Sequence, residues 1–591
     1  MDGIPARTFY GGPTVASYYR QRDIPNESED SELSDDDISE PTTAPQVTTV
    51  SDTTSDEEDN VPLSHLRNST TTKKKPKNPI KWKPSSTKRN VTTNQFTGDE
   101  LLPGNILTLN TPLKLFSHFI SDDFLVEVVR QTCLYSVQTN PAKPITTCPE
   151  EIQNFIGILL WMSLIRQPTS RRYWSPKTRI PQVADVMPVN RFEQIKRYIH
   201  FSDNSNNAKG IDKIQPVITQ IRNACLKIPL EENLSCDEQV ISFKGRSRYK
   251  TYNPKKPHKW GYKMWVLSGI SGISYNFELF SGKGDNTHTA NEPDLGAASN
   301  VVIRMSKIVP HNEHYKLYYD NYFSSLELVS HLSKRNIHSV ATVRSNRLKN
   351  SKMMQEKEMK RKGRGSIQEQ TATVDGIDIH AIQWYDNKIV SLISDYCGTE
   401  PTVKVKRFFR SEQTRKDIQC PDIVKEYNRH MGGVDLLDSL LGLYPIKLKS
   451  KKWYHRIFYH LIDVAVVNSW LVDRRIKKQL GKTEDVVPLL VFKTLAEQLC
   501  AQKNIVTKHK RAGRPRSSSP QCLPKRRCLE ARPSSYIQED RTDHWPSWTT
   551  NRERCKRRTC KGKSRVVCVK CKIHLCFHPN KNCFKEFHVD V

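Results

Sequence analysis

The segment 231–343 alternates short apolar runs with helical periodicities, and this order restricts the fold more than any other feature of the chain. Strands are predicted at 234–243, 262–270 and 273–280, and Ser271-Gly272 joins the last two as a hairpin turn. A helix, a strand, a helix and a strand follow, at 300–308, 315–320, 325–335 and 338–343. Three strands followed by this alternation are compatible with a ribonuclease-H-like α/β sheet.

Helical periodicity dominates on both sides of this segment. Apolar residues recur at helical spacing before it, in the stretches 101–115, 124–135, 152–165 and 190–201. The same spacing returns after it, at 422–441 and 453–478. Between these helices, residues 346–366 are predicted to be a Lys/Arg-rich loop and residues 373–394 to be further strands.

Aspartates stand where a ribonuclease-H-like sheet holds carboxylates. Asp237 lies within the first strand and Asp320 closes the fourth, while Asp435 begins a helix and Asp438 follows one turn later on the same face. A lone aspartate is usually a cap or a surface charge. Carboxylates in this order, however, can hold two divalent metals, and Mg²⁺ prefers oxygen ligands. The spacing therefore raises the hypothesis of a two-metal Mg²⁺ site and leaves the capping alternative open.

The sequence around these aspartates is more specific than their spacing. The stretches Ser235-Cys-Asp-Glu-Gln, Tyr318-Tyr-Asp-Asn-Tyr-Phe-Ser-Ser and Tyr427-Asn-Arg-His-Met-Gly-Gly-Val-Asp-Leu-Leu-Asp resemble the piggyBac transposase family. Lys452-Trp-Tyr fits the same pattern. The resemblance extends over about 99–480 and resumes in the Cys-rich tail.

This resemblance implies a DDD/DDE-type DNA transposase. Asp237, Asp320 and Asp435 would be the catalytic triad that holds Mg²⁺, and Asp438 would be a further acidic residue of the site. The family excises elements by nicking and hairpin formation and inserts them at TTAA sites. Its partners would be transposon terminal repeats, TTAA target DNA and a second copy of the chain. The alternative is a domesticated relative that binds DNA in the nucleus without transposing.

The expected architecture is an α/β ribonuclease-H-like core, a flanking helical domain, a β-rich insertion domain and a C-terminal zinc domain. We predict a disordered N-terminus at 1–98 and a basic linker at 503–540. By resemblance, the helices at 99–230 and 446–502 would form one dimerisation and DNA-binding domain. The catalytic domain would comprise 231–345 and 422–445, and the insertion domain 346–421.

A dense cluster of cysteine and histidine occupies residues 541–591 and indicates metal binding. Six of the 15 cysteines fall here, and the absence of a secretory signal in residues 1–20 disfavours disulfides. Structural zinc takes four nitrogen or sulfur ligands, so two ions need eight. The predicted set is Cys555, Cys560, Cys568, Cys571, Cys576, His578, Cys583 and His588.

These ligands form four successive pairs along the sequence, and we expect a cross-brace in which pairs one and three share one ion. The Cys576-x-His578 spacing is tight for a ligand pair, so His544 or His574 remains an alternative to His578. The family's Cys-rich domain binds element-end DNA, although such domains also bind proteins. Arg557 and Arg558, within a run of basic residues, favour DNA.

The charge distribution also indicates a polyanionic partner. The net charge is +30, although residues 27–59 carry thirteen acidic residues and no Lys or Arg. That acidic segment is interpreted as a solubilising tail or as a competitor with DNA for the basic surface. The stretch 508–516 resembles a minor-groove hook, with Arg514 and Arg516 as DNA-binding residues, and it could equally be a nuclear signal. The sequence contains no apolar run of about 18 residues, so no transmembrane helix is predicted.

Overall fold

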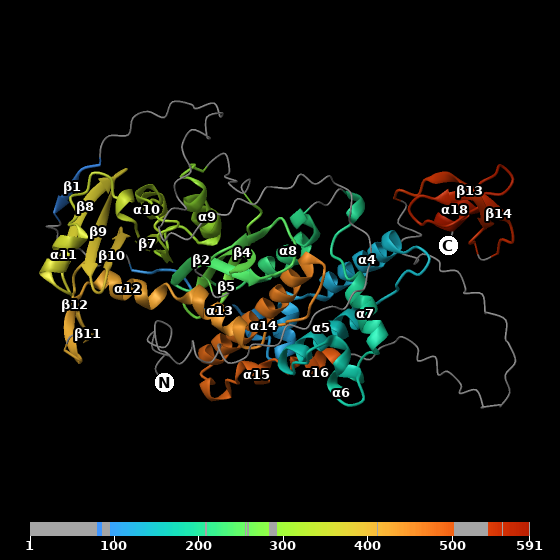
Figure 1. Cartoon of the computed structure of the whole chain (residues 1–591), viewed down its shortest axis with the longest axis horizontal. Helices are drawn as coiled ribbons and strands as arrows, with labels where there is room; N and C mark the ends of the chain where they lie inside the picture. The colour runs from blue at the N-terminus through green and yellow to red at the C-terminus, as the bar shows by residue number, and fades with distance from the viewer. Residues whose placement is uncertain are drawn as a thin grey trace, which may run out of the picture. The chain divides into compact units, whose positions relative to one another are not determined.

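The computed structural model describes residues 80–84, 95–206, 210–254, 256, 259–282, 292–410, 412–501, 542–557 and 559–589 (Figure 1). The acidic segment 27–59, the stretch 508–516 and Arg558 lie outside the described residues. Across the described ranges, none of the helices has both the length and the apolar character needed to cross a bilayer.

Five strands form the part of the main sheet that carries the aspartates. They are β2 (Asn233–Ser242), β4 (Trp260–Gly269), β5 (Ser274–Leu279), β6 (Lys316–Tyr319) and β7 (His338–Thr342). They pair in the order β5-β4-β2-β6-β7. β4 is antiparallel to both of its neighbours β2 and β5, whereas β6 is parallel to both β2 and β7. The predicted strand positions and the predicted hairpin are confirmed.

These strands are apolar along most of their length because the sheet is covered by other elements. β4 is buried at nearly every position, as is typical of a strand shielded on both faces. Gly272 makes the tight turn before β5 with a φ of 88°, a conformation that favours glycine. The crossover from β6 to β7 runs through α10 (Leu326–Ser333), whose N-cap Ser325 accepts a hydrogen bond from the Leu328 amide.

The sheet continues beyond β7 into the region predicted as an insertion. β10 (Ile389–Ser394) pairs with β7, and β9 (Ile377–Tyr385) and β8 (Ile367–Val374) follow in order. A separate hairpin is formed by β11 (Val403–Phe409) and β12 (Thr414–Cys420). The whole sheet has ten strands.

Two local predictions are wrong in this region. Within the segment predicted to be disordered, β1 (Trp82–Pro84) forms an edge strand on β8, and the Trp82 indole donates to the Lys349 carbonyl at 2.9 Å. An edge strand needs pairing on one side only, so a short polar segment suffices. Within the predicted loop, α11 (Glu356–Lys362) forms instead, with acidic residues in its first turn and basic residues in its last.

Helices surround the core, and the predicted helical stretches on both sides are confirmed. Those before the core are α2 (Gly104–Leu107), α3 (Pro112–Phe119), α4 (Asp122–Thr139), α5 (Pro149–Leu164), α7 (Val189–Tyr198) and α8 (Gln215–Cys225). Those after it are α12 (Asp422–His430), α13 (Gly433–Leu443), α14 (Trp453–Gln479), α15 (Leu489–Phe492) and α16 (Leu495–Cys500). The Asn468 side chain of α14 hydrogen-bonds the backbone N–H and C=O of Ser274, which fixes this long helix to β5.

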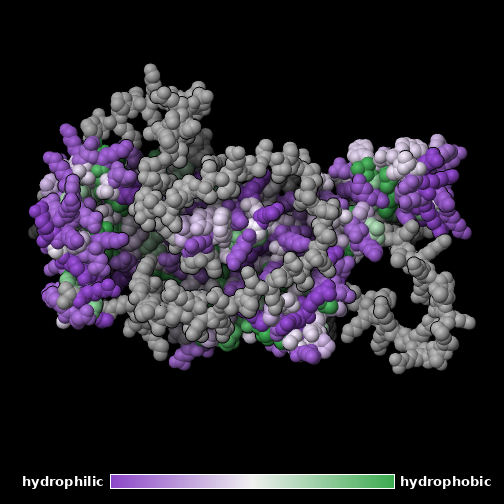
Figure 2. All heavy atoms as spheres, in the orientation of Figure 1, coloured by the Kyte–Doolittle hydropathy of each residue, from purple (hydrophilic) through white to green (hydrophobic). Residues whose placement is uncertain are grey.

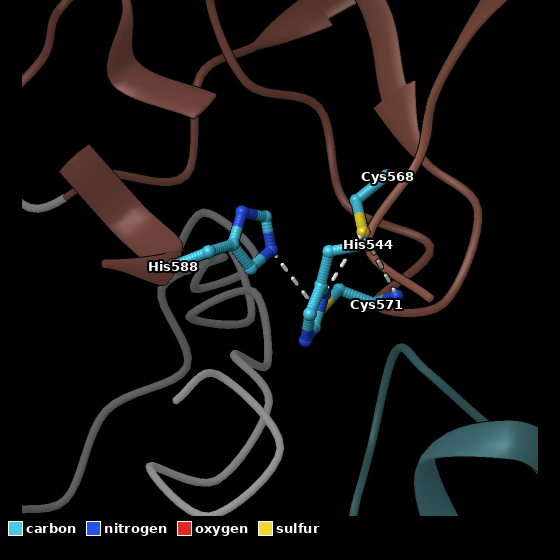
Figure 3. A group of neighbouring side chains, drawn as sticks. All are labelled: His544, Cys568, Cys571 and His588. Carbon is cyan, nitrogen blue, oxygen red and sulfur yellow. Dashed lines mark hydrogen bonds between the residues drawn. The ribbon is translucent and has the colours of Figure 1, made fainter. Parts of the chain in front are cut away.

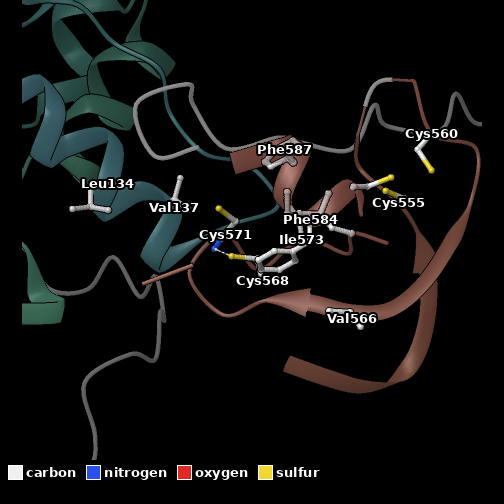
Figure 4. Packing of buried hydrophobic residues seen from close by; sticks show 12 residues of the cluster. Leu134, Val137, Cys555, Cys560, Val566, Cys568, Cys571, Ile573, Phe584 and Phe587 are labelled. Carbon is white, nitrogen blue, oxygen red and sulfur yellow. Dashed lines mark hydrogen bonds between the residues drawn. The ribbon is translucent and has the colours of Figure 1, made fainter. Parts of the chain in front are cut away.

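The C-terminal segment is a small module built from β13 (Pro546–Arg554), β14 (Lys563–Cys568) and α18 (Cys583–His588). Its apolar core includes Val566, Ile573, Phe584 and Phe587, packed among buried cysteines (Figure 4). So few large apolar side chains cannot stabilise a module of this size without another source of free energy.

Candidate active site and candidate zinc sites

Asp237 and Asp320 occupy matching positions on neighbouring parallel strands. In the register of β2 and β6, Cys236 pairs with Tyr319; Asp237 is the next residue of β2, and Asp320 follows directly after the end of β6. One oxygen of Asp237 accepts a hydrogen bond from the Glu238 amide at 2.7 Å. The equivalent oxygen of Asp320 accepts from the Asn321 amide at 2.6 Å and from the Thr342 hydroxyl at 2.7 Å. These bonds fix the orientation of both carboxylates.

Asp435 reaches this part of the sheet because α13 packs very closely onto it. Gly433 opens the helix, and a Cβ added there would clash with the Gly269 carbonyl oxygen and lie 2.6 Å from the Ser235 hydroxyl. Only glycine allows this approach of the helix to β2 and β4. Asp435 lies in the first turn, and Asp438 follows on the same face.

The electrostatics of the site show that the carboxylates are crowded. The pKa of Asp237 is raised to about 7, mainly by burial and to a smaller extent by the negative charges of Asp435 and Asp320, although Lys256 opposes this. Burial likewise raises the pKa of Asp438 to about 6, with Asp435 adding to the effect. The charges of Asp435 and Asp320 thus act on Asp237, and the charge of Asp435 acts on Asp438.

This donor set fits divalent cations. Carboxylate oxygens suit Mg²⁺, and a bound cation would offset both the burial of Asp237, which is the main cause of its raised pKa, and the smaller effect of the neighbouring aspartate charges. The chemistry of the residues present is thus compatible with the expected metal.

Within the described residues, the tail brings cysteine and histidine together in two groups of four. In each group the ligand atoms lie within 4.8 Å of one another. The first group is Cys555, Cys560, Cys576 and Cys583. In it, Cys560 Sγ and Cys576 Sγ are 3.8 Å apart, which matches the edge of about 3.8 Å for a tetrahedron with Zn–S bonds of about 2.3 Å.

The second group is His544, Cys568, Cys571 and His588 (Figure 3). Cys571 Sγ lies 3.4 Å from both His544 Nδ1 and His588 Nε2. The His588 Nδ1–H donates to the Phe584 carbonyl at 2.8 Å, so Nε2 is the nitrogen left for a metal. Such a second bond commonly orients histidine ligands. The four cysteine and histidine side chains fit a structural zinc ion.

Two features of the predicted ligand arrangement are corrected. His578 is exposed and belongs to neither group, and His544 occurs where a fourth ligand is needed. Cys583 joins the first group rather than the second. His544 becomes a ligand because of the fold of the segment before β13. A hydrogen bond from the Val569 amide to the Trp545 carbonyl brings residue 544 beside Cys568. The groups still interleave along the chain, as a cross-brace requires.

The other predicted residues of the tail have different surroundings. The His574 Nδ1–H donates to the Ser564 carbonyl at 3.1 Å, so His574 is held by β14 and lies outside both groups. Arg557 is partly exposed and pairs with Glu586. These contacts give His574 and Arg557 positions in the module, and neither residue belongs to a group that could hold a metal ion.

Sequence reasoning missed the residues that support the aspartates. Gln239 donates to Asp438 and contacts His460, and Gly433 permits the helix approach. A signal existed for Gln239, because residues 237 and 239 share one face of a strand. His460 carries no comparable signal, since its contact depends on how α14 crosses the sheet.

Comparisons with known proteins show which family this chain resembles. The family model described as Transposase IS4 matches residues 111–470. Human PiggyBac transposable element-derived protein 3 is 25% identical over 519 residues, which cover 86% of this chain and 81% of that protein. Human PiggyBac transposable element-derived protein 2 is 29% identical over 371 residues, 62% of each chain.

A solved structure shares the fold. The piggyBac transposase in a cryo-EM synaptic complex with hairpin DNA superposes with a TM-score of 0.56 and 21% identity. The match covers 80% of this chain and 98% of that chain.

Proposed function

We propose that this chain, which belongs to the piggyBac-type family of IS4 transposases, is a metal-dependent DNA transposase that cleaves and joins DNA strands. One observation carries the proposal. Asp237 on β2 and Asp320 at the end of β6 follow paired residues of adjacent parallel strands, and Gly433 lets α13, which carries Asp435, pack closely onto β2 and β4. The strand order β5-β4-β2-β6-β7 around them supports a ribonuclease-H-like core.

Asp237, Asp320 and Asp435 would hold two Mg²⁺ ions, and Asp438 would add negative charge beside them. When bound, such ions stabilise charge on the attacking and leaving oxygens of a phosphodiester. The chain's own part is orientation. The Glu238 and Asn321 amides and the Thr342 hydroxyl each hold one carboxylate oxygen, which limits rotation of Asp237 and Asp320. This preorganisation lets the carboxylates act without rearranging.

The DNA would be the ends of a transposable element, excised through hairpins and inserted at TTAA sites. The fold is similar to that of a piggyBac transposase solved with hairpin DNA, and this similarity supports the proposed DNA substrate. A homodimer and a nuclear location belong to the same proposal.

Basic surfaces support DNA binding. Figure 2 shows that hydrophilic residues cover the visible face over α11 and β8–β12. The exposed basic residues of α11 and of the β11–β12 hairpin are Lys357, Lys360, Arg361, Lys362, Lys404, Lys406, Arg410, Arg415 and Lys416. Phosphate contacts of this kind depend steeply on salt, with a slope of about −0.9 per phosphate. Arg514, Arg516, Arg557 and Arg558 are proposed as further contacts.

The C-terminal module would bind two zinc ions and contact element-end DNA. Its two groups of cysteine and histidine have tetrahedral-like spacings, and its apolar core is small. Zinc binding would therefore supply much of its folding free energy.

An excision assay tests the proposal. A reporter gene is interrupted by DNA that carries the genomic sequences flanking this chain's coding region, and the chain is expressed beside it in cells. We expect the reporter to be restored by seamless removal that leaves TTAA. The matched control is Asp320→Asn. Restoration at the same rate with Asp320→Asn, or none with the wild-type chain, would contradict the proposal.

The second candidate is a domesticated DNA-binding protein without transposition. The human relatives, which are described as transposable element-derived proteins, favour it. Retained binding to element ends together with no excision would support this candidate instead.

A further inference from the structure

A chain of hydrogen bonds runs from α14 to an acidic residue of the candidate active site. Gln239 Nε2 donates to Asp438 Oδ1 at 2.5 Å, and His460 Nε2 lies 2.7 Å from Gln239 Oε1. Gln239 is fully buried and His460 is 8% exposed. The three side chains come from β2, α14 and α13, so these hydrogen bonds link the sheet to two helices.

The direction of these bonds is set by what each group can do. An ionised carboxylate only accepts, so the amide nitrogen of Gln239 faces Asp438 and its carbonyl faces His460. The His460 Nε2–H must therefore donate to that carbonyl. Burial lowers the pKa of His460 to about 3, with the charge of Arg456 as the second cause, so the ring is neutral. A neutral imidazole has one N–H, and here it lies on Nε2.

We propose that Gln239 and His460 are positioning residues that keep the Asp438 carboxylate beside Asp435. This rests on the proposed function for the metal site and for the activity readout. Without the His460 donor, the Gln239 carbonyl would be buried and unpaired, which is costly. Rotation of the amide would then turn that carbonyl toward Asp438, and two acceptors would face each other. Asp438 would lose its fixed position.

The competing explanation is that His460 only anchors α14 to the sheet. The same helix offers a matched control, because the Asn468 side chain anchors it to the Ser274 backbone and to Cys225, and among the described residues it makes no hydrogen bond to an aspartate. Asn468→Leu should therefore weaken folding without affecting Asp438. His460→Leu should affect both.

A double-mutant cycle separates positioning from anchoring. The zinc-loaded full chain is titrated with Mn²⁺ alone and followed by electron paramagnetic resonance, and strand cleavage is measured in parallel. We expect His460→Leu to weaken Mn²⁺ binding about tenfold, which corresponds to about 1.4 kcal/mol, whereas His460→Gln keeps a donor and stays near wild type. In an Asp438→Asn background, His460→Leu should cause no further loss.

The same loss from His460→Leu in both backgrounds would overturn the inference, as would an equal loss from Asn468→Leu. If His460→Leu does not fold, Gln239→Met replaces it in the cycle. A non-additive Mn²⁺ cycle in a chain that cleaves no DNA would sink the proposed function and leave this inference standing. DNA cleavage together with an additive Mn²⁺ cycle would support the proposed function and overturn this inference.

Discussion

Gly433 contacts the main sheet so closely that a Cβ in its place would lie 2.6 Å from the Ser235 hydroxyl, two residues before Asp237. This contact joins the helix that carries Asp435 and Asp438 to the strand that carries Asp237. The position of the third aspartate thus depends on the absence of one side chain.

Gly433→Ala should push α13 away from the sheet. Overpacking of this kind costs about 1–3 kcal/mol, which exceeds the gain of up to about 1 kcal/mol from the helix propensity of alanine. We expect a lower Tm and a loss of DNA cleavage. The control is Gly432→Ala, because a Cβ there meets nothing within 4 Å. Equal stability and activity of the two variants would contradict the close-packing account.

His544→Ala should remove one zinc ion from the full chain, and His578→Ala should remove none. His544 Nδ1 lies 3.4 Å from Cys568 Sγ, whereas His578 is exposed and outside both groups. Native mass spectrometry counts the ions, and His574→Ala serves as a second variant that should keep both. One missing ion in His578→Ala, or two ions in His544→Ala, would reverse the assignment.

The candidate aspartates and the strands and helix that carry them could be predicted from the sequence, because Asp237, Asp320 and Asp435 each lie within a short, specific stretch. The ligand set of the tail could not be completed in the same way. His544 is eleven residues before Cys555 and reaches Cys568 only through the hydrogen bond between Trp545 and Val569. Local spacing favoured His578, but a ligand set is fixed by how the chain returns on itself.

The continuation of the main sheet from β7 into β10 also could not be predicted from the sequence. Apolar alternation predicted strands at 373–394, but the pairing of β10 with β7 is a non-local contact that alternation does not encode. β1 has too few residues to show a period at all.

Acid should destabilise the helices through His200. Burial lowers its pKa from 6.5 to about 4, so the folded state keeps it neutral while the unfolded chain takes up a proton. Its stabilising contribution is present above pH 6.5 and is lost as pH falls toward 4, by roughly 1.4 kcal/mol per unit. The charged groups acting on it are Lys452, Lys213 and Asp203.

His200→Gln provides the measurement. Glutamine keeps partners for the Tyr454 hydroxyl and the Asn204 side chain but does not titrate. Thermal melts between pH 7 and pH 5 should show a shallower loss of Tm for this variant than for the wild type. An identical slope would show that His200 takes no part.

Deletion of residues 27–59 should tighten non-specific DNA binding, because thirteen acidic residues no longer compete for the basic surface. Fluorescence anisotropy with random duplex DNA measures this at fixed ionic strength. The difference should shrink as salt rises. Equal affinity at low salt would leave the segment as a solubilising tail.

The most direct test of the account is single-turnover cleavage of duplex DNA carrying the flanking genomic sequence and TTAA, in the presence of Mg²⁺. Asp237→Asn, Asp320→Asn and Asp435→Asn each keep side-chain volume and remove charge, so we predict loss of cleavage with DNA binding and Tm retained. Asp378→Asn, an exposed change on β9, should cleave like the wild type. Cleavage by all three aspartate variants at the wild-type rate would contradict the metal-triad account.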